Sequence, residues 1–547
     1  MRTQTSGRSG TGPTLLLTLF LSLAAFAQTG GELHFSIAGD PKTFDPLQVT
    51  EENSDTIRSL TNSTLLRMDR KTFELKPELA ESWKVSDMGR RIQFKLRSGV
   101  RFSDGNPLDA EDVAFTLRQL LDPKAKVPAG DSLRPEKGTT TITVLNPREV
   151  ALAVPDPVAG LDMLFYEIPI LSSRSPLKEK AGLGPFVVSE YKAGNYISLK
   201  RNPNYWKKDG QGHALPYLDS VRIDIQQNRE IALTRFQRGE LQFLSSIDID
   251  SFDRLGVANG AVDAGETFDS EMLWFNQVAA APIDAYKKAW FRSKEFRRAL
   301  SEAIQRDDLV KLVYRGRATA AAGPFSPTAK PWANTHLKPH AFDPDGALKL
   351  LATVGFKKNG TVLRDGAGNA VEFSVVTNAG NKSRAHMATL IQQDFSRIGI
   401  KLNIVTLDMP SLIERISRNF QYEACLLGFS GVALDPNDQL NVWMSSSATH
   451  QWNPHQATPE TPWEAEIDKL MTEQSSAPDV RKRKALLDRM QEIVWEQVPM
   501  IYLVHPHALV AVSPKLGNVA PSVLRPRVFW NIDQLFLQKA TLVGQLR

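Results

Sequence analysis

The sequence is poor in cysteine and, after its first thirty residues, in long apolar runs. Its single cysteine, Cys425, cannot close an intramolecular disulfide, which excludes a disulfide-stabilised scaffold. Because Cys425 lies in an apolar run far from the N-terminus, a lipid-modified cysteine at the start of the mature chain is also excluded. No later apolar segment reaches the roughly 20 residues that span a bilayer. We therefore expect a soluble mature protein that is not a lipoprotein.

The sequence also lacks the motifs of several enzyme classes. No glycine-rich loop ends in Lys-Ser or Lys-Thr, as nucleotide hydrolysis requires. His336 and His340 are spaced as on one helix face, but Pro339 interrupts it and no glutamate completes a zinc-protease pattern. The glycines at 428 and 431 do not have the spacing of a serine-hydrolase elbow, and no His/Cys cluster indicates a metal. We expect no catalytic residue, no metal and no cofactor.

Residues 1–27 are typical of a secretory signal peptide. Arg2 and Arg8 precede an apolar run from Leu15 to Leu23, and Ala25-Phe26-Ala27 supplies a small-x-small cleavage site. We expect the mature chain to begin near Gln28 and to reside in a periplasm-like compartment. The formal net charge of +5 is too small to indicate a nucleic-acid partner, and the length allows two or more domains.

A fifty-residue stretch from Asn419 to Asp468 contains no Lys or Arg. At the frequency of the whole chain, 66 in 547 residues, roughly six are expected there. The stretch begins with an apolar run at 424–429 that predicts a buried strand, and a turn-rich loop follows, with Trp443 and Trp452 further on. Such a pattern is typical either of a cleft wall that stacks on an uncharged or cationic ligand or of a core segment with buried tryptophans.

Alternating strand and helix patterns indicate an α/β protein. Side chains alternate between apolar and polar at 92–97, which predicts a half-buried strand. Asp109 is placed to cap a helix that Pro123 ends. Further strands are expected at 32–37, 221–225, 402–405 and 500–504, and further helices at 53–66, 295–306 and 385–398.

Two segments close together carry a family resemblance. Residues 94–105 read FKLRSGVRFSDG, and residues 108–113 read LDAEDV. This pair resembles the signature of the dipeptide, oligopeptide and nickel class of extracellular solute-binding proteins, family 5, which are receptors of ABC importers. Further pieces resemble the family in the same order at 79–83, 184–187, 201–206, 238–241, 275–276, 296–306, 350–356 and 391–400.

The resemblance implies a two-lobe periplasmic binding protein fold of the α/β class, with an extra subdomain and several crossovers between the lobes. It assigns residues 28–62, 183–268 and 500–547 to lobe 1, 63–182 to the extra subdomain, and 269–499 to lobe 2. It also implies a monomeric receptor that encloses a small peptide between its lobes and delivers it to an ABC permease in the inner membrane. An oligosaccharide receptor of the same fold is the alternative, and a periplasmic hydrolase or chaperone is a more distant one.

The resemblance also implies a ligand site between two loops. In lobe 1 the matching loop supplies the expected contacts Thr50, Glu51, Glu52 and Asn53, whose backbone groups pair with an extended ligand. In lobe 2 an alignment on Gly428 and on Asp435-Pro436 adds Gly428, Phe429, Ser430 and Gly431.

The amino-group anchor of the peptide-binding members is missing from the lobe 2 loop. In those members an aspartate follows a Gly-Trp pair, whereas this sequence has Phe429 in place of the tryptophan and Val432 in place of the aspartate. Asp435 and Asp438 are the candidate substitutes, although a carboxylate beside proline in a turn often has a structural role.

Overall fold

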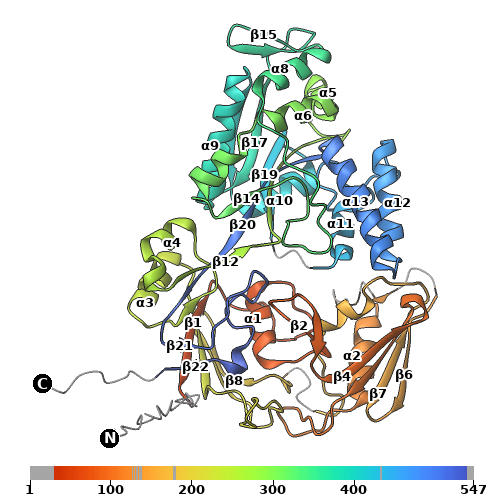
Figure 1. The fold of residues 1–547 in the computed structure, drawn as a ribbon, viewed down its shortest axis with the longest axis vertical. Coiled ribbons are helices and arrows are strands. Elements are labelled where there is room, and N and C mark those ends of the chain that lie inside the picture. Colours follow the sequence, from red (N-terminus) through yellow and green to blue (C-terminus); the bar gives the residue numbers. More distant parts are fainter. Residues whose placement is uncertain are drawn as a thin grey trace, which may run out of the picture.

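The computed structural model describes residues 30–125, 127, 130, 133–134, 138–175, 180–430 and 434–538. Its largest sheet runs through two lobes in the order β18-β17-β19-β13-β20-β11-β1-β10-β9-β8 (Figure 1). The α/β class and the two lobes expected from the sequence are confirmed. The expected signal peptide lies outside the described residues. Within the described part of the chain, no helix combines the length and the apolar character needed to cross a bilayer.

The lower lobe in Figure 1 is built around parallel strands β1 and β10. Leu33 and Phe35 of β1 are fully buried because alternate side chains of a strand face the same side, and they pack with Val221 and Ile223 of β10. The elements of this lobe are β1 (Glu32–Ile37), α1 (Glu52–Thr61), β8 (Phe186–Lys192), β9 (Tyr196–Arg201), β10 (Ser220–Ile225), α3 (Arg229–Gln237), β11 (Phe243–Leu244), α4 (Ile249–Leu255) and β12 (Ala261–Glu266).

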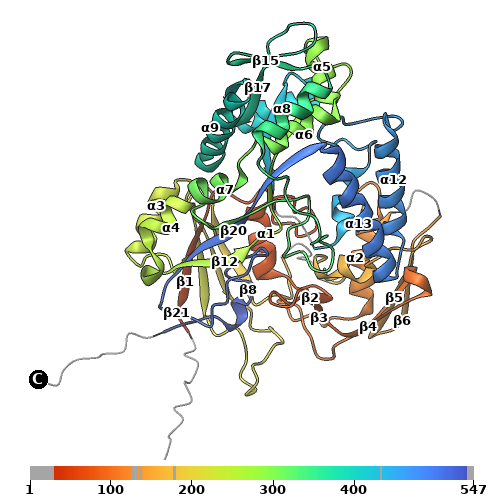
Figure 2. The same cartoon turned by 45° about the horizontal axis from the view of Figure 1, so that its top comes forward.

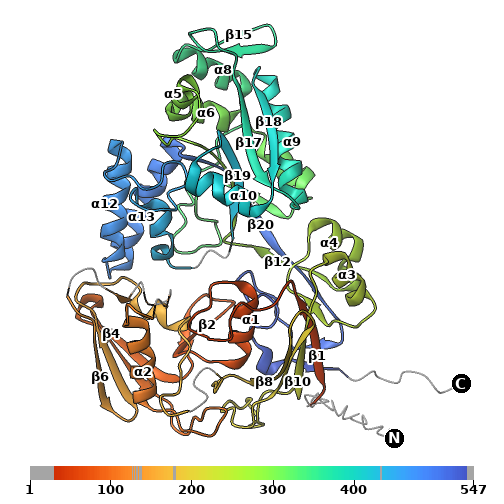
Figure 3. The same cartoon turned by 180° about the vertical axis from the view of Figure 1, so that it is seen from behind.

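A separate four-stranded sheet and helix α2 lie at one side of the lower lobe, opposite α3 and α4 (Figure 3). The sheet has the order β4-β5-β7-β6, and Ile92, Phe94 and Leu96 of β5 are buried as their alternation predicts. Asp109 caps α2 by accepting from the Glu111 amide at 3.0 Å. The elements are β2 (Leu66–Met68), β3 (Leu75–Pro77), β4 (Ala80–Ser86), β5 (Arg91–Leu96), α2 (Ala110–Leu121), β6 (Thr141–Asn146) and β7 (Glu149–Ala153).

The upper lobe surrounds the other half of the large sheet. Its parallel strands β18, β17 and β19 are followed by the antiparallel strand β13. Cys425 of β19 is fully buried, and burial raises the pKa of its thiol, so this cysteine is unreactive. The elements are β13 (Ser270–Phe275), α5 (Ala285–Arg292), α6 (Lys294–Glu302), β14 (Ala318–Ala320), α8 (Pro344–Thr353), β17 (Glu372–Asn378), α9 (Lys382–Arg397), β18 (Lys401–Leu407), α10 (Met409–Glu414), β19 (Ala424–Phe429), α11 (Leu440–Trp443), α12 (Pro462–Ser475) and α13 (Val480–Gln497).

Two segments connect the lobes. One leads from β12 to β13, and the other is β20 (Met500–Val512), a strand of 13 residues that pairs with β13 and β14 above and with β11 and β12 below. Figure 2 shows β12 and β20 crossing side by side between the lobes. Because β20 pairs with β12 and β13 on either side of the short link at 267–269, relative motion of the lobes has to bend both connections together.

The lobes also touch away from the connecting strands. The amide of Ala159 donates to the Ser475 carbonyl at the end of α12 over 2.8 Å, and Asn437 Nδ2 donates to the Ala159 carbonyl over 3.1 Å. The next residue, Gly160, has a φ of +68°, and a Cβ built there would lie 2.6 Å from Oδ2 of Asp435. Only glycine fits this contact between the lobes.

Replacing Gly160 with alanine is therefore expected to hold the lobes apart. The Asp435 carboxylate cannot give way, because Arg483 donates two hydrogen bonds to it at 2.8 and 2.6 Å. Small-angle scattering should give a larger radius of gyration for Gly160→Ala than for the wild type. Gly194→Ala is the matched control, since Gly194 has a φ of +69° and a Cβ added to it would meet no atom within 4 Å. Equal radii for all three proteins would contradict this role of the contact.

Candidate functional site

A cavity of about 980 Å³ lies in the lower lobe and reaches Phe268 and Asp269, where the chain passes to the upper lobe. Its size is typical of ligand pockets. One wall is the polar face of α1, formed by Asp55, Arg58, Ser59 and Asn62 at helical spacing, while the opposite face of α1 is buried. The other walls come from β2 and β3, residues 97–100, residues 166–169, residues 205–208 and residues 523–534.

The cavity walls are rich in charged side chains of both signs. The basic residues are Arg58, Arg67, Arg70, Arg97, Lys207, Lys208, Arg525 and Arg527, and the acidic residues are Asp55, Glu78, Glu81, Glu167, Asp269 and Asp533. Several of them form ion pairs within the wall, such as Arg58 with Asp55 at 2.5 Å and Lys207 with Asp533 at 3.5 Å. These walls suit a polar or zwitterionic ligand better than an apolar one.

The predicted lobe 1 loop lies beside this cavity but does not line it. The carboxylate of Glu51 caps α1 by accepting from the amides of Asn53 and Ser54, both at 2.7 Å. Partial burial alone would raise the pKa of Glu51, but these hydrogen bonds hold it below its ordinary value. Glu52 is exposed and pairs with Arg525 at 2.6 Å, Thr50 is exposed, and Asn53 is half-buried. A contact of these residues with ligand stays a prediction.

In the predicted lobe 2 loop, Gly428 and Phe429 form the end of β19. Gly428 lies opposite Glu271 of β13, and a Cβ there would come within 2.8 Å of the Glu271 carboxylate, which Arg384 holds at 2.6 Å. Phe429 packs against the core of the upper lobe, and Ser430 is exposed. Gly431 and Val432 lie outside the described residues, so the position of the missing aspartate is not described.

The two candidate substitutes for that aspartate have different surroundings. Asp435 is buried and accepts two hydrogen bonds from Arg483 and one from the Asn437 amide, which is a structural role. The side chain of Asp438 forms no hydrogen bond or ion pair with any residue in the described ranges. The surrounding protein displaces water from Asp438, and Glu167 and Asp435 repel its charge, which together raise its pKa to about 7. Asp438 is therefore the acid of this loop that is available to a ligand.

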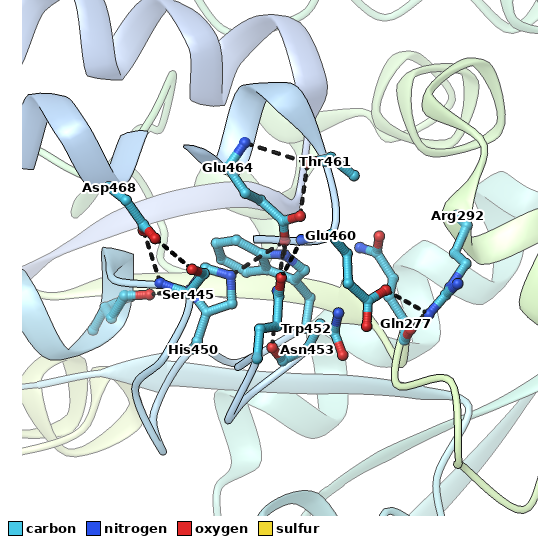
Figure 4. A network of polar contacts seen from close by, with 12 residues as sticks. Gln277, Arg292, Ser445, His450, Trp452, Asn453, Glu460, Thr461, Glu464 and Asp468 are labelled. Carbon is cyan, nitrogen blue, oxygen red and sulfur yellow. Dashed lines mark hydrogen bonds and ion pairs between the residues drawn. The ribbon is translucent and has the colours of Figure 1, made fainter. Parts of the chain in front are cut away.

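Trp443 and Trp452 lie in the core of the upper lobe, with exposed fractions of 1% and 0%. Figure 4 shows Trp452 beside the buried carboxylate of Glu464, to which its Nε1 donates over 3.0 Å. Gln456 and Thr461 also donate to this carboxylate, at 2.8 and 2.6 Å, and His450 lies at 3.4 Å. Of the two alternatives, a cleft wall or a core segment, the burial of both tryptophans fits the core segment. Neither tryptophan has an exposed ring face on which a ligand could stack.

Of the two histidines that the sequence singled out, His336 is exposed and His340 has structural surroundings. His340 is buried between the Ser301 hydroxyl at 2.8 Å and the Trp495 carbonyl at 3.1 Å. Burial and the nearby charges of Arg298 and Arg306 lower its pKa to about 3, so it stays neutral. Among the described residues, no group of three or more His, Cys, Asp and Glu side chains is placed to hold a metal ion.

None of the described candidate residues from the sequence lines the cavity, and the residues that do, among them Arg70, Tyr166 and Glu167, were not identified as site residues from the sequence. Arg70 stands in the turn after β2, and Glu167 follows the short helix Leu161–Tyr166. Arg58 of α1 donates to the Glu167 carbonyl over 3.1 Å, which brings this segment against the helix. No sequence spacing relates these residues, because they meet only through tertiary packing.

Comparison with known proteins gave matches along most of the chain. Residues 74–451 match the model of the bacterial extracellular solute-binding proteins, family 5 middle region. The sequence is 27% identical to a probable ABC transporter-binding protein of Deinococcus radiodurans, with 87% of each chain covered. It is 26% identical to the oligopeptide-binding protein AppA of Bacillus subtilis, with 94% of this chain and 92% of AppA covered.

A solved structure of AppA from Bacillus subtilis in complex with a nonapeptide is also similar to the fold. Its TM-score is 0.72 at 25% identity, and the match covers 94% of this chain and 100% of that one. The match extends over both lobes, which confirms the two-lobe binding-protein fold expected from the sequence.

The Glu464 network predicts a pH-dependent part of the stability. Burial alone would raise the pKa of Glu464, but the donors around it lower the value from 4.5 to about 2. The ionised carboxylate therefore stabilises the folded state above pH 4.5, and this contribution is lost as the pH falls towards 2. The shift corresponds to about 3 kcal/mol.

Glu464→Gln should therefore be less stable than the wild type at neutral pH and should lose less stability in acid. Thermal unfolding followed by circular dichroism across this pH range measures both effects. Glu466→Gln, which changes an exposed glutamate of the same helix, should follow the wild-type curve. Parallel curves for Glu464→Gln and the wild type would show that the network does not hold the carboxylate ionised.

Proposed function

Because the chain belongs to family 5 of the bacterial extracellular solute-binding proteins, we propose that it is a peptide receptor of an ABC importer. As a member of this family the chain is a solute-binding protein and not an enzyme, in agreement with the sequence. The observation that carries the proposal is the match of both lobes to a peptide-bound relative, AppA. The permease partner is supported by the Deinococcus radiodurans relative, which is named as an ABC transporter-binding protein.

In this proposal the receptor acts by a shift between open and closed lobes. A ligand that contacts both lobes only when they are closed stabilises that state by its difference in affinity. The direct contacts between the lobes include exposed ion pairs, Arg315 with Asp250 at 2.6 Å and with Asp253 at 2.5 Å. Such pairs contribute at most about 1 kcal/mol each, so a ligand can decide the equilibrium.

The amino end of the peptide is assigned to Asp438 and Glu167. Asp438 belongs to the upper lobe and Glu167 to the lower one, and Glu167 helps to raise the Asp438 pKa, so the two carboxylates lie near each other. An ammonium group between them would relieve this repulsion. Since one acid comes from each lobe, closure would place both on the same ligand charge.

The remaining parts of the proposal concern location and organisation. We include export by a signal peptide over residues 1–27, a periplasmic mature chain that begins near Gln28, and a monomeric state. The boundaries of lobe 1, the extra subdomain and lobe 2 are those given by the sequence. The family description as extracellular supports the export.

An oligosaccharide ligand is the second candidate, favoured by the tryptophans, by Val432 in place of the aspartate, and by the absence of Lys and Arg from 419–468. Since Trp443 and Trp452 are buried, the support from the tryptophans is lost. The charged cavity walls favour a ligand that itself carries charge, which a peptide does and a neutral sugar does not.

The direct test is to identify what the protein binds when it is made. The full chain is expressed with its N-terminal region, purified without refolding, denatured, and the released small molecules are identified by mass spectrometry. We expect short peptides, because slow dissociation retains tight ligands through purification. Release of a saccharide as the main species would instead favour the second candidate.

The assignment of Asp438 predicts a pH-dependent affinity. Because its pKa is about 7 without ligand, a proton competes with the peptide ammonium, and binding should tighten as the pH rises from about 6 to about 7.5. Asp438→Asn should bind a random tripeptide pool more weakly and without this trend, measured as a thermal shift. Asp345→Asn, an exposed acid on α8, is the control. An unchanged trend in Asp438→Asn would refute the assignment.

A further inference from the structure

One arginine of the cavity wall, Arg70, differs from the others in its surroundings. The side chain of Arg70 lines the cavity, yet it forms no hydrogen bond and no ion pair with any residue of the described ranges. Three other arginines of the same walls are paired: Arg58 with Asp55, Arg525 with Glu52, and Arg527 with Asp269. Arg70 is therefore an exception among the arginines around it.

Because Arg70 is largely shielded from water, leaving its charge without a partner is energetically unfavourable. Burial lowers the pKa of Arg70, and the charges of Glu167 and Asp55 only partly oppose this effect. A poorly hydrated charge without a hydrogen-bonded partner is unfavourable, so such groups concentrate where a ligand supplies the partner.

Further groups without partners lie around the same cavity. Arg527 Nε, Trp206 Nε1 and Asn531 Oδ1 are buried and have no hydrogen-bond partner in the part of the chain that the structure describes, and all three residues line the cavity. Arg527 belongs to a segment next to Arg70, because Ser522 donates its hydroxyl to the Arg70 carbonyl at 3.4 Å and its amide to the Arg527 carbonyl at 2.8 Å. Two guanidinium groups with unused donors thus come from neighbouring segments.

We propose that Arg70 binds a carboxylate of the ligand. The planar array of guanidinium donors matches the two oxygens of a carboxylate. Glu167 and Asp55 keep the local charge close to neutral, which favours a singly charged carboxylate over a doubly charged phosphate. This inference rests on the proposed function and adds that the peptide presents either its terminal carboxylate or an acidic side chain to Arg70.

A first test separates a binding role from a structural one. Since Arg70 has no hydrogen-bonded or ion-paired partner among the described residues, Arg70→Gln should leave the melting temperature of the ligand-free protein unchanged or raise it. A structural arginine would lower it. Arg118→Gln, which removes an exposed arginine of α2, is the matched control for the charge change.

The second test uses three tripeptide pools with free amino ends: one with a free carboxyl end, one amidated and without acidic residues, and one amidated with a glutamate. Wild type and Arg118→Gln should bind the first pool about tenfold or more tightly than the second, the gain typical of a charge-assisted hydrogen bond. Arg70→Gln should lose this preference, and Arg70→Lys should keep part of it. Tight binding of the third pool that also depends on Arg70 would identify an acidic side chain as the ligand group.

The outcomes distinguish this inference from the proposed function. If wild type binds the pools but shows no preference for a carboxylate, or if Arg70→Gln keeps the preference, the Arg70 site is wrong and peptide binding stands. If no pool binds the wild type, peptide binding is wrong and the inference falls with it.

Discussion

The hydrogen bonding of β20 to strands of both lobes is the constraint on which the rest of the structure depends. Buried backbone groups have to be paired, and the 13 residues of β20 meet this need by joining the sheets of the two lobes. At its middle, Pro506 cannot donate, but its carbonyl accepts from the amide and the hydroxyl of Thr267 at 3.1 and 2.7 Å. The two connecting segments are therefore tied together at the point where the lobes meet.

The cavity lies on one side of the crossing formed by β20 and the link at 267–269. The upper-lobe loop that holds Asp435 and Asp438 lies on the other side. Asp269, which lines the cavity, lies two residues after Thr267. It forms an ion pair at 3.5 Å with Arg527, which follows β20 in the chain. A movement of this crossing thus acts on the cavity wall as well as on the distance between the lobes. In the proposed receptor this arrangement would couple ligand contacts in the lower lobe to closure of the upper one.

The charged groups of the molecule fall into two kinds. Asp435 with Arg483 and Glu464 with its donors are buried and fully hydrogen-bonded, so they specify how the upper lobe packs. Asp438 and Arg70 have no such partners in the described part of the chain, at a cost to stability. Unpaired groups of this kind are expected where binding, rather than folding, selects the residue.

Local structure was predictable from the sequence because its causes are local. The alternation of Ile92, Phe94 and Leu96, the cap at Asp109 and the apolar run of β19 each act over a few residues, and the structure has these elements where they were expected. The family, and with it the two-lobe fold, was recognisable because its signature at 94–113 is continuous in the sequence.

The tertiary structure alone decided which of these residues are held in structural contacts and which are not. Asp435 and Asp438 stand three residues apart in one loop, and only the approach of Arg483 from α13 makes the first structural and leaves the second free. Trp443 and Trp452 fit a cleft wall and a core equally well by sequence, and the packing around Glu464 places them in the core. Arg70 carries no signal in the sequence, since the absence of a partner is a property of the surroundings that the fold creates.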